Sequence, residues 1–239
     1  MQTVRRKEVD DMSIIEKLKE MIQVFRNNDK NADSTEAEAL FPHKVLNKSV
    51  LVISDTHGHL AYTDPLNILP DIERNKQVDM VFFLGDHDSR DLDKILDILG
   101  DVPCFGVAGN HDSFDVYKNH NIENIHGKVI EVDGIRIGGL SGCLKYKNAN
   151  DRAFLTEEEA EDILSRMDDV DILLTHAPEY REEDADDVAH RGFQAINAYI
   201  EKHHPSYHFY GHMHQQTMYA DKFGCYHYCV YKAKGFRQI

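Results

Sequence analysis

Five short apolar segments of this 239-residue chain each end in residues of the kinds that bind divalent metal ions. The first is Val-Leu-Val-Ile at residues 50–53, a run rich in β-branched residues that is typical of a buried strand. Asp55 and His57 follow it and offer a carboxylate and an imidazole, and Gly58 closes the turn. Open α/β sheets bind ligands at the carboxyl ends of their strands, so this position suits a metal site.

The same order of strand and polar turn returns four times further along the chain. The later turns read Gly85-Asp86-His87-Asp88, Gly109-Asn110-His111-Asp112, Thr175-His176 and Gly211-His212-Met213-His214. A single Asp-x-His pair is a weak signal, because many strands end in a polar turn. Five such turns in one chain predict a site that several strands assemble together.

The hydrophobic pattern predicts strands that alternate with helices early in the chain and hairpins later. Strands are expected at residues 50–53, 78–84, 102–108, 170–174 and 207–210. Helices are expected near 71–76 and 92–98, from a cap at Thr156 to about 167, and at 192–203. Residues 128–140 indicate a hairpin that turns at Asp133-Gly134, and two short aromatic strands are expected after residue 217. The acidic run 179–187 is expected to be a solvated surface loop.

Residues 1–47 are expected to form an arm ahead of a single domain at 48–239. Within the arm, residues 13–25 carry an apolar helical stripe with Ser13 and Glu16 as a capping box, and 27–38 indicate a polar linker. The arm is expected to pack on the domain, with oligomerisation as the alternative, and the oligomeric state is left open. The N-terminus is charged, and no apolar run approaches the roughly 18 residues that a membrane span needs. These features predict a cytoplasmic protein with reduced cysteines.

Charge and histidine content narrow the class of function. The net charge of −15 argues against non-specific binding to nucleic acid, which needs clustered Lys and Arg. The chain has 15 histidines, and neutral histidine is the commonest metal ligand. Cys225, His227 and Cys229 alternate with their neighbours, which favours one face of a late strand over a zinc site. Surface or packing positions are expected for His43, His120, His126, His203, His204 and His208.

Taken in order, the five turns resemble those of the calcineurin-like metallophosphoesterase family. The resemblance runs from about residue 49 to the C-terminus, and Gly-Asn-His-Asp and Gly-His-x-His are its most specific motifs. It implies an α/β fold of four layers, an α/β/β/α sandwich with two mixed β-sheets. It also implies two divalent metal ions, with manganese favoured and iron or zinc also suited to a mixed shell of imidazole, carboxylate and amide ligands.

The resemblance implies a role for each turn. The ligands would be Asp55, His57 and His214 for the first ion, Asp86 for both ions, and Asn110, His176 and His212 for the second. Asn110 would also contact the substrate. His111 would not bind metal but would stabilise or protonate the leaving oxygen. Outside the motifs, His190 is a further candidate to approach the pocket.

The second turn departs from the family pattern. Many members have Gly-Asp-x-x-Asp, whereas here Ser89 stands at the later Asp position and Asp88 comes one residue early. What orients His111 is therefore open between Asp88, Asp112 and water. Arg90, next in the chain, is a candidate to bind a phosphate oxygen, and the alternative is an exposed position on the first turn of a helix.

The expected function is hydrolysis of a phosphoester by a metal-bound hydroxide, with His111 assisting the leaving group. A small phosphodiester or nucleotide is favoured over a monoester, by analogy with other short members of the family. One alternative is a metal-dependent nuclease, against which the negative charge stands. The other is a non-catalytic protein-binding scaffold, which would not need the full ligand set. A small phosphoester is the expected partner, and neither a membrane nor long nucleic acid is expected.

Overall fold

The structure is a computed structural model that describes residues 43–60, 67–147 and 151–239. The predicted arm helix at 13–25 and the linker at 27–38 lie outside the described residues. The last residues of the arm pack on the domain: the Leu46 N–H donates to the Ile239 carbonyl, and His43 Nε2 lies 2.8 Å from the Tyr207 hydroxyl. Among the described helices, none is both long enough and apolar enough to cross a bilayer.

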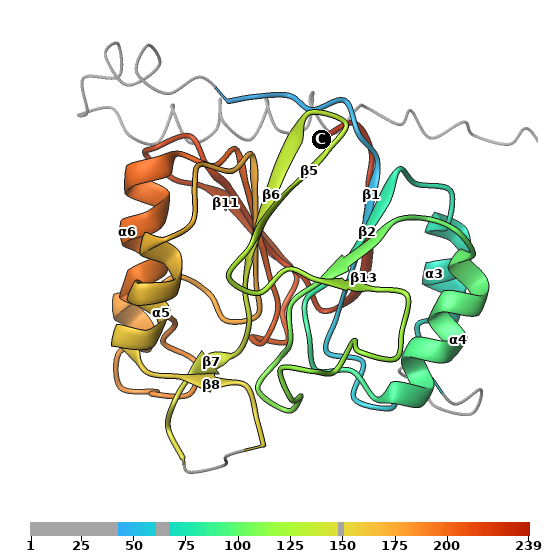
Figure 1. The fold of residues 1–239 in the computed structure, drawn as a ribbon, viewed down its shortest axis with the longest axis horizontal. Helices are drawn as coiled ribbons and strands as arrows, with labels where there is room; N and C mark the ends of the chain where they lie inside the picture. Colours follow the sequence, from blue (N-terminus) through green and yellow to red (C-terminus); the bar gives the residue numbers. More distant parts are fainter. Residues whose placement is uncertain (1–42, 61–66, 148–150) are drawn as a thin grey trace, which may run out of the picture.

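Two mixed sheets lie face to face, and each carries a pair of helices on its outer side (Figure 1). The first sheet has the order β13 (Lys232–Phe236), β1 (Val50–Ser54), β2 (Met80–Phe83), β3 (Cys104–Gly106), β4 (Glu123–Asn124). The second has the order β11 (Thr217–Ala220), β12 (Tyr226–Cys229), β10 (Tyr207–Tyr210), β9 (Ile172–Thr175), β6 (Ile135–Leu140), β5 (Val129–Val132). The remaining elements are α3 (Leu69–Asn75), α4 (Ser89–Leu99), α5 (Glu157–Ser165), α6 (Gln194–His203), the 3-10 turn η1 (Glu182–Asp184), and the short pair β7 (Cys143–Leu144) and β8 (Phe154–Leu155). The predicted α/β/β/α sandwich is confirmed.

Alternating side chains of β1 explain why both faces of the first sheet are buried. Val50 and Val52 point into the core between the two sheets, where they join Phe209 of β10. Leu51 and Ile53 point the other way, into the core under α3 and α4. A third apolar core lies between the second sheet and the pair α5 and α6. A strand buried on both faces appears in sequence as a continuous apolar run, as 50–53 does.

The C-terminal tail differs from the prediction. It forms three strands instead of two, and the third, β13, belongs to the first sheet and pairs antiparallel with β1 from Val50↔Phe236 to Ser54↔Lys232. Most residues of β13 are only half-buried. An edge strand of this kind needs no continuous apolar run, so Lys-Ala-Lys-Gly-Phe gave no strand signal.

The topology brings the polar turns to one edge of the molecule. Strands β1, β2 and β3 are parallel neighbours, as are β9 and β10 in the facing sheet. The two sheets touch where these strands end. His176 Nδ1, after β9, lies 2.6 Å from the Leu84 carbonyl, after β2. Turns that are far apart in sequence therefore meet at the carboxyl ends of five strands.

Candidate metal centre

Glycines next to the polar residues allow the strand ends to approach closely. A Cβ atom on Gly109 would stand 2.1 Å from Asp86 Oδ1, and one on Gly85 would stand 2.1 Å from the Gly109 nitrogen. A Cβ on Gly211 would stand 2.0 Å from the Ser54 hydroxyl oxygen. A side chain at these glycines of three motifs would collide with backbone or side-chain atoms of a neighbouring turn.

Many of the predicted metal ligands have strained, left-handed backbone conformations. Ten non-glycine residues of the described chain have positive φ, and five of them are Asp55, His57, Asp86, His212 and His214. A left-handed conformation costs a non-glycine residue of order 1–3 kcal/mol, and such strain clusters at functional sites. The turns are therefore held in this shape by the contacts around them.

Asp55, His57 and His214 form one group. His57 Nε2 lies 3.2 Å from His214 Nε2, and Asp55 Oδ1 lies 3.4 Å from His214 Nε2 and 3.8 Å from His57 Nε2. Asp55 is buried, and no described residue forms a hydrogen bond with its Oδ1, whereas Oδ2 accepts from the Ser54 hydroxyl. Burial opposes ionisation, yet His214 and His176 hold the pKa of Asp55 well below its usual value. A buried carboxylate oxygen without a donor, facing two imidazole nitrogens, fits a bound cation.

Asp86, Asn110 and His176 form a second group, which lies next to the first. Asp86 Oδ2 lies 3.6 Å from His176 Nε2 and 3.8 Å from His57 Nε2, so it stands between the two groups. The Nδ1–H of His176 donates to the Leu84 carbonyl, which leaves a lone pair on Nε2. That Nε2 lies 2.9 Å from Asn110 Oδ1, and in a neutral ring the two atoms face each other as acceptors. Burial is outweighed by Asp86 and Asp55, which raise the pKa of His176 and favour a proton at this place when no metal ion is bound. A metal ion between these atoms would replace that proton, and the carboxylate, amide and imidazole donors fit a second metal ion.

His212 lies beside the second group. Its ring centroid is 4.9 Å from that of His176, and its Nε2 donates to the Ala189 carbonyl at 2.7 Å. Burial, and then the neighbouring His176, lower the pKa of His212 to about 3, so the ring is neutral with its lone pair on Nδ1. His190, predicted only as a candidate, packs on the ring of His212 at 4.8 Å.

His111 is exposed at the rim of the cluster. Its ring centroid is 5.4 Å from that of His57, and its backbone N–H donates to Asp86 Oδ1. Neither carboxylate proposed from sequence to orient the ring does so. Asp88 caps α4 and pairs with Arg90, and Asp112 accepts backbone N–H groups. Within the described residues no hydrogen bond reaches the His111 imidazole.

Asp112 instead fixes the backbone under the cluster. Its carboxylate accepts the N–H groups of Asp86, His87 and Gly109, which come from two different turns. Burial, and then the charge of Asp86, raise the pKa of Asp112 to about 6. The family's later Asp has no counterpart here, and Asp112 holds the two turns together.

No hydrogen bond or ion pair in the described chain joins Arg90 or the His87 ring to a predicted metal ligand, but His87 Nδ1 lies 3.1 Å from the hydroxyl of Thr56, which stands between Asp55 and His57. Arg90 lies on the first turn of α4 with 86 % of its side chain exposed, and its Nε donates to Asp88. Its role in phosphate binding stays a prediction. His87 is buried against Phe83, and burial lowers its pKa to about 3.

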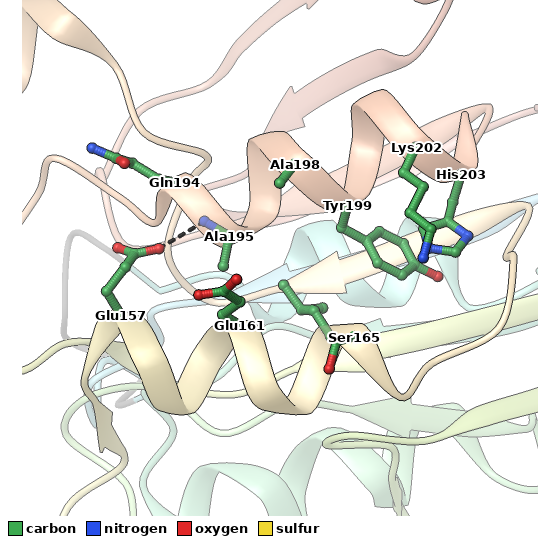
Figure 2. A pocket seen from close by; sticks show the side chains of 10 residues that line it. Glu157, Glu161, Ser165, Gln194, Ala195, Ala198, Tyr199, Lys202 and His203 are labelled. Carbon is green, nitrogen blue, oxygen red and sulfur yellow. Dashed lines mark hydrogen bonds between the residues drawn. The ribbon is translucent and has the colours of Figure 1, made fainter.

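A groove of about 440 Å³ lies elsewhere, between α5 and α6. Figure 2 shows side chains of both helices lining it, with the Glu157 carboxylate accepting the Ala195 N–H at 2.7 Å. No predicted metal ligand lines this groove. It is the seam between two helices of the outer layer, and the predicted chemistry is not located there.

One cluster of carboxylate and imidazole side chains was not predicted from the sequence. Glu179, His208 and His227 converge inside the second sheet and are all buried. The acidic run 179–187 is therefore not entirely a solvated loop, because Glu179 turns inward. His227 does lie on a late strand, as predicted, and the four cysteines are free and buried. The available signal was the pattern of two histidines inside apolar strands, which is unusual for packing residues.

This fold and these clusters define an α/β protein with a metal-binding centre at the edge shared by two packed sheets. A family comparison matches residues 48–216 to calcineurin-like phosphoesterases, and the chain belongs to this family. It is thus a member of a family of metal-dependent phosphoester hydrolases, and its structure contains residue clusters suited to divalent metals. No curated protein sequence matches the chain significantly.

Solved structures show the same fold at low sequence identity. Protein TT1561 of Thermus thermophilus is 15 % identical, with 82 % of this chain and 100 % of that chain covered, at a TM-score of 0.55. The phosphopantetheinyl hydrolase of Mycobacterium tuberculosis is 15 % identical, with 77 % of this chain and 89 % of that chain covered, at a TM-score of 0.54. At this identity the likeness concerns the fold.

Proposed function

We propose that this protein hydrolyses a small phosphodiester or nucleotide at a centre of two divalent metal ions. The observation that carries the proposal is the position of Asp86 Oδ2, 3.8 Å from His57 Nε2 and 3.6 Å from His176 Nε2. A carboxylate between two sets of imidazoles suits a ligand shared by two ions. When bound, such a pair neutralises phosphate oxygens, supplies a nucleophile from water at neutral pH and aligns the ester.

The residues divide into two ligand sets around Asp86. The first set is Asp55, His57 and His214, and the second is Asn110, His176 and His212. Second-layer hydrogen bonds support these roles, because the Leu84 and Ala189 carbonyls hold protons on the far nitrogens of His176 and His212. Manganese is the favoured ion, and iron or zinc suit the same mixture of ligands.

His111 gives a proton to the leaving oxygen in this proposal. Its exposed ring stands beside His57, so a substrate bound at the centre lies within its reach. Its backbone is tied to Asp86 and leaves the imidazole free of protein hydrogen bonds in the described chain. A positioned imidazole of this kind serves both as general acid and as a charge that stabilises a developing alkoxide.

The preference for a small diester over long nucleic acid rests on the net charge of the chain. A chain with net charge −15 repels a long polyanion except at the metal centre itself.

The four free, buried cysteines support a reducing, cytoplasmic location.

The test is a substrate comparison with purified, manganese-loaded protein. Cyclic nucleotides, dinucleotides, nucleoside monophosphates and long single- and double-stranded DNA and RNA are compared by kcat/KM. We expect the highest value for a small diester. A far higher value for long nucleic acid would favour a nuclease, and no turnover of any ester by metal-loaded protein would favour a scaffold.

A further inference from the structure

A buried triad of Glu179, His208 and His227 lies apart from the centre described above and shares no residue with it. Glu179 Oε2 is 3.3 Å from the Nδ1 atoms of both histidines, and these two nitrogens are 3.1 Å apart. The exposed fractions are 5 %, 0 % and 2 %, so water does not screen the three groups. Three metal-ligand atoms thus form a nearly equilateral triangle inside the protein.

The sheet itself places the two histidines together. His208 of β10 and His227 of β12 are register partners in a parallel pair, so their side chains stand next to each other on the same face. Glu179 reaches them from the loop after β9, the other neighbour of β10. The triad therefore joins three consecutive segments of the second sheet.

Hydrogen bonds outside the triad fix the tautomer of both rings. The Thr175 hydroxyl donates to the Ala177 carbonyl at 2.5 Å, so its oxygen accepts the Nε2–H of His208 at 2.8 Å. The Asp221 carboxylate accepts the Nε2–H of His227 at 3.2 Å. With a proton on each Nε2, a neutral ring presents its Nδ1 lone pair to the triangle. Without a metal ion, burial is outweighed by Asp221, Cys225 and Glu179, which raise the pKa of His227 to about 11, so a proton on its Nδ1 takes the place of the cation. Metal-binding histidines are held in this way by carboxylates and other acceptors behind them.

Glu179 is oriented in the same manner. Its Oε1 accepts the Tyr219 hydroxyl, so Oε2 alone faces the two nitrogens. Three buried lone-pair atoms within 3.3 Å of one another repel unless a positive charge stands among them. Two nitrogens bound to one tetrahedral zinc at about 2.05 Å are about 3.3 Å apart, which matches these separations.

We propose that Glu179 Oε2, His208 Nδ1 and His227 Nδ1 supply three of the four ligands of one zinc ion in the second sheet, with a water as the fourth. The ion ties the loop after β9 to β10 and β12. Because the ligands converge only when these segments pair, zinc binds the folded chain and stabilises it against unfolding. The alternative cation is a proton, which would make the triad a buried imidazolium and carboxylate pair.

The first experiment measures zinc bound per chain by elemental analysis after chelation, reloading with zinc and gel filtration. The Glu179→Gln variant and the His208→Gln/His227→Gln variant are compared with wild type and with the control His203→Gln. His203 is a largely buried histidine outside the triad that is paired with Asp169. Far-ultraviolet circular dichroism checks the fold of each protein. We expect the triad variants to bind one zinc ion fewer per chain than wild type and the control. Equal zinc content in folded triad variants would overturn the site.

The second experiment needs no variant in the triad. Crystals of the zinc-loaded wild-type protein are examined by anomalous scattering at the zinc edge. A peak about 2 Å from the three ligand atoms is expected. No peak there, with peaks at other sites in the same crystal, would show that a proton holds the triad together. The same peak should remain in crystals of Asp86→Asn, which separates this site from the proposed catalytic centre.

Discussion

The backbone N–H of His111 donates to Asp86 Oδ1 at 2.8 Å. The other oxygen of the same carboxylate faces His57 and His176. The proposed shared ligand and the proposed general acid are therefore parts of one rigid unit, since a single side chain fixes both. A substitution of Asp86 can keep the oxygen that accepts the His111 N–H and remove the negative charge of the carboxylate. Such a substitution separates metal binding from the positioning of His111.

Asp86→Asn makes that change. An amide oxygen can still accept the His111 N–H, but the charge between the two ligand sets is lost. We expect metal content and hydrolysis of an aryl phosphodiester to fall together, and chelation of wild-type protein to abolish activity until manganese is restored. Metal analysis and steady-state rates on the same samples check this.

Asp88→Asn is the matched control for Asp86→Asn. Asp88 caps α4 through the Arg90 N–H, and asparagine caps helices about as well as aspartate. Its metal content and activity should stay at wild-type values. Full activity in metal-free wild-type protein would contradict the metal-dependent reaction.

His111→Ala should keep the metals and the fold but lose turnover. General acids typically contribute about 10²–10⁴-fold in rate, and we expect a loss of this order for a diester with a nucleoside leaving group. The loss should shrink for nitrophenoxide, which departs without a proton. The measurement is kcat for both substrates, with His203→Ala as the control.

Two outcomes would revise the role of His111. Loss of one metal ion in His111→Ala would make this histidine a ligand. An equal fall in kcat for both leaving groups would show that the imidazole stabilises charge in the transition state and does not transfer the proton.

Gly211→Ala should damage the centre through packing alone. The added Cβ would stand 2.0 Å from the Ser54 hydroxyl oxygen and 2.8 Å from Asp55 Oδ2. Overpacking costs about 1–3 kcal/mol of unfolding free energy, and here it also displaces a proposed ligand. Urea denaturation and metal titration should show lower stability and weaker metal binding.

Gly134→Ala is the control for Gly211→Ala, because it should lower stability without touching the metal centre. Gly134 has φ +77 in a turn with open space around it, so alanine there adds backbone strain without a collision. A left-handed residue costs roughly 1–2 kcal/mol. The variant should lose stability and keep its metal affinity. Equal metal affinity in both variants would show that Gly211 has no part in the centre.

His126 should make stability fall with decreasing pH. Its Nδ1 accepts the Ser141 N–H at 3.0 Å, and burial, followed by the charge of Lys128, lowers its pKa below 6.5. A histidine with a depressed folded pKa contributes stability that is complete above pH 6.5 and is lost as pH falls below that value. In His126→Gln, which keeps an acceptor, unfolding free energy should decline less between pH 7 and pH 5.

The difference between the two proteins isolates this group, because the other titrating residues are common to both. Guanidinium denaturation at several pH values gives the two curves. Parallel curves would show that His126 does not titrate with unfolding.

Much of the fold could be predicted because its signals are local. The continuous apolar run at 50–53 predicted a buried strand, and β1 is buried on both faces. Thr156 and Glu159 predicted a capping box, and both hydrogen bonds of that box begin α5. The strand β13 was missed, since its half-buried edge position imposes no apolar pattern of its own.

The predicted ligands converge for the same reason. Asp55, Asp86, Asn110 and His176 each follow the end of a strand, and parallel pairing brings these ends together. The orientation of His111 could not be predicted in this way. Whether Asp88 or Asp112 reached its ring depended on the caps and backbone donors around each carboxylate, and both proved to be occupied by backbone N–H groups.

The sequence by itself determined the four-layer fold, the family and the group of turns that gather at one edge. Each of these could be inferred from residue types at short spacing along the chain. No knowledge of contacts between distant residues was needed. Only the tertiary structure decided that Glu179 turns inward to meet His208 and His227, and that Asp112 accepts backbone N–H groups of the second turn and does not reach the His111 ring. Those relationships join residues far apart in sequence, and they arise from strand register and backbone packing that no local pattern encodes.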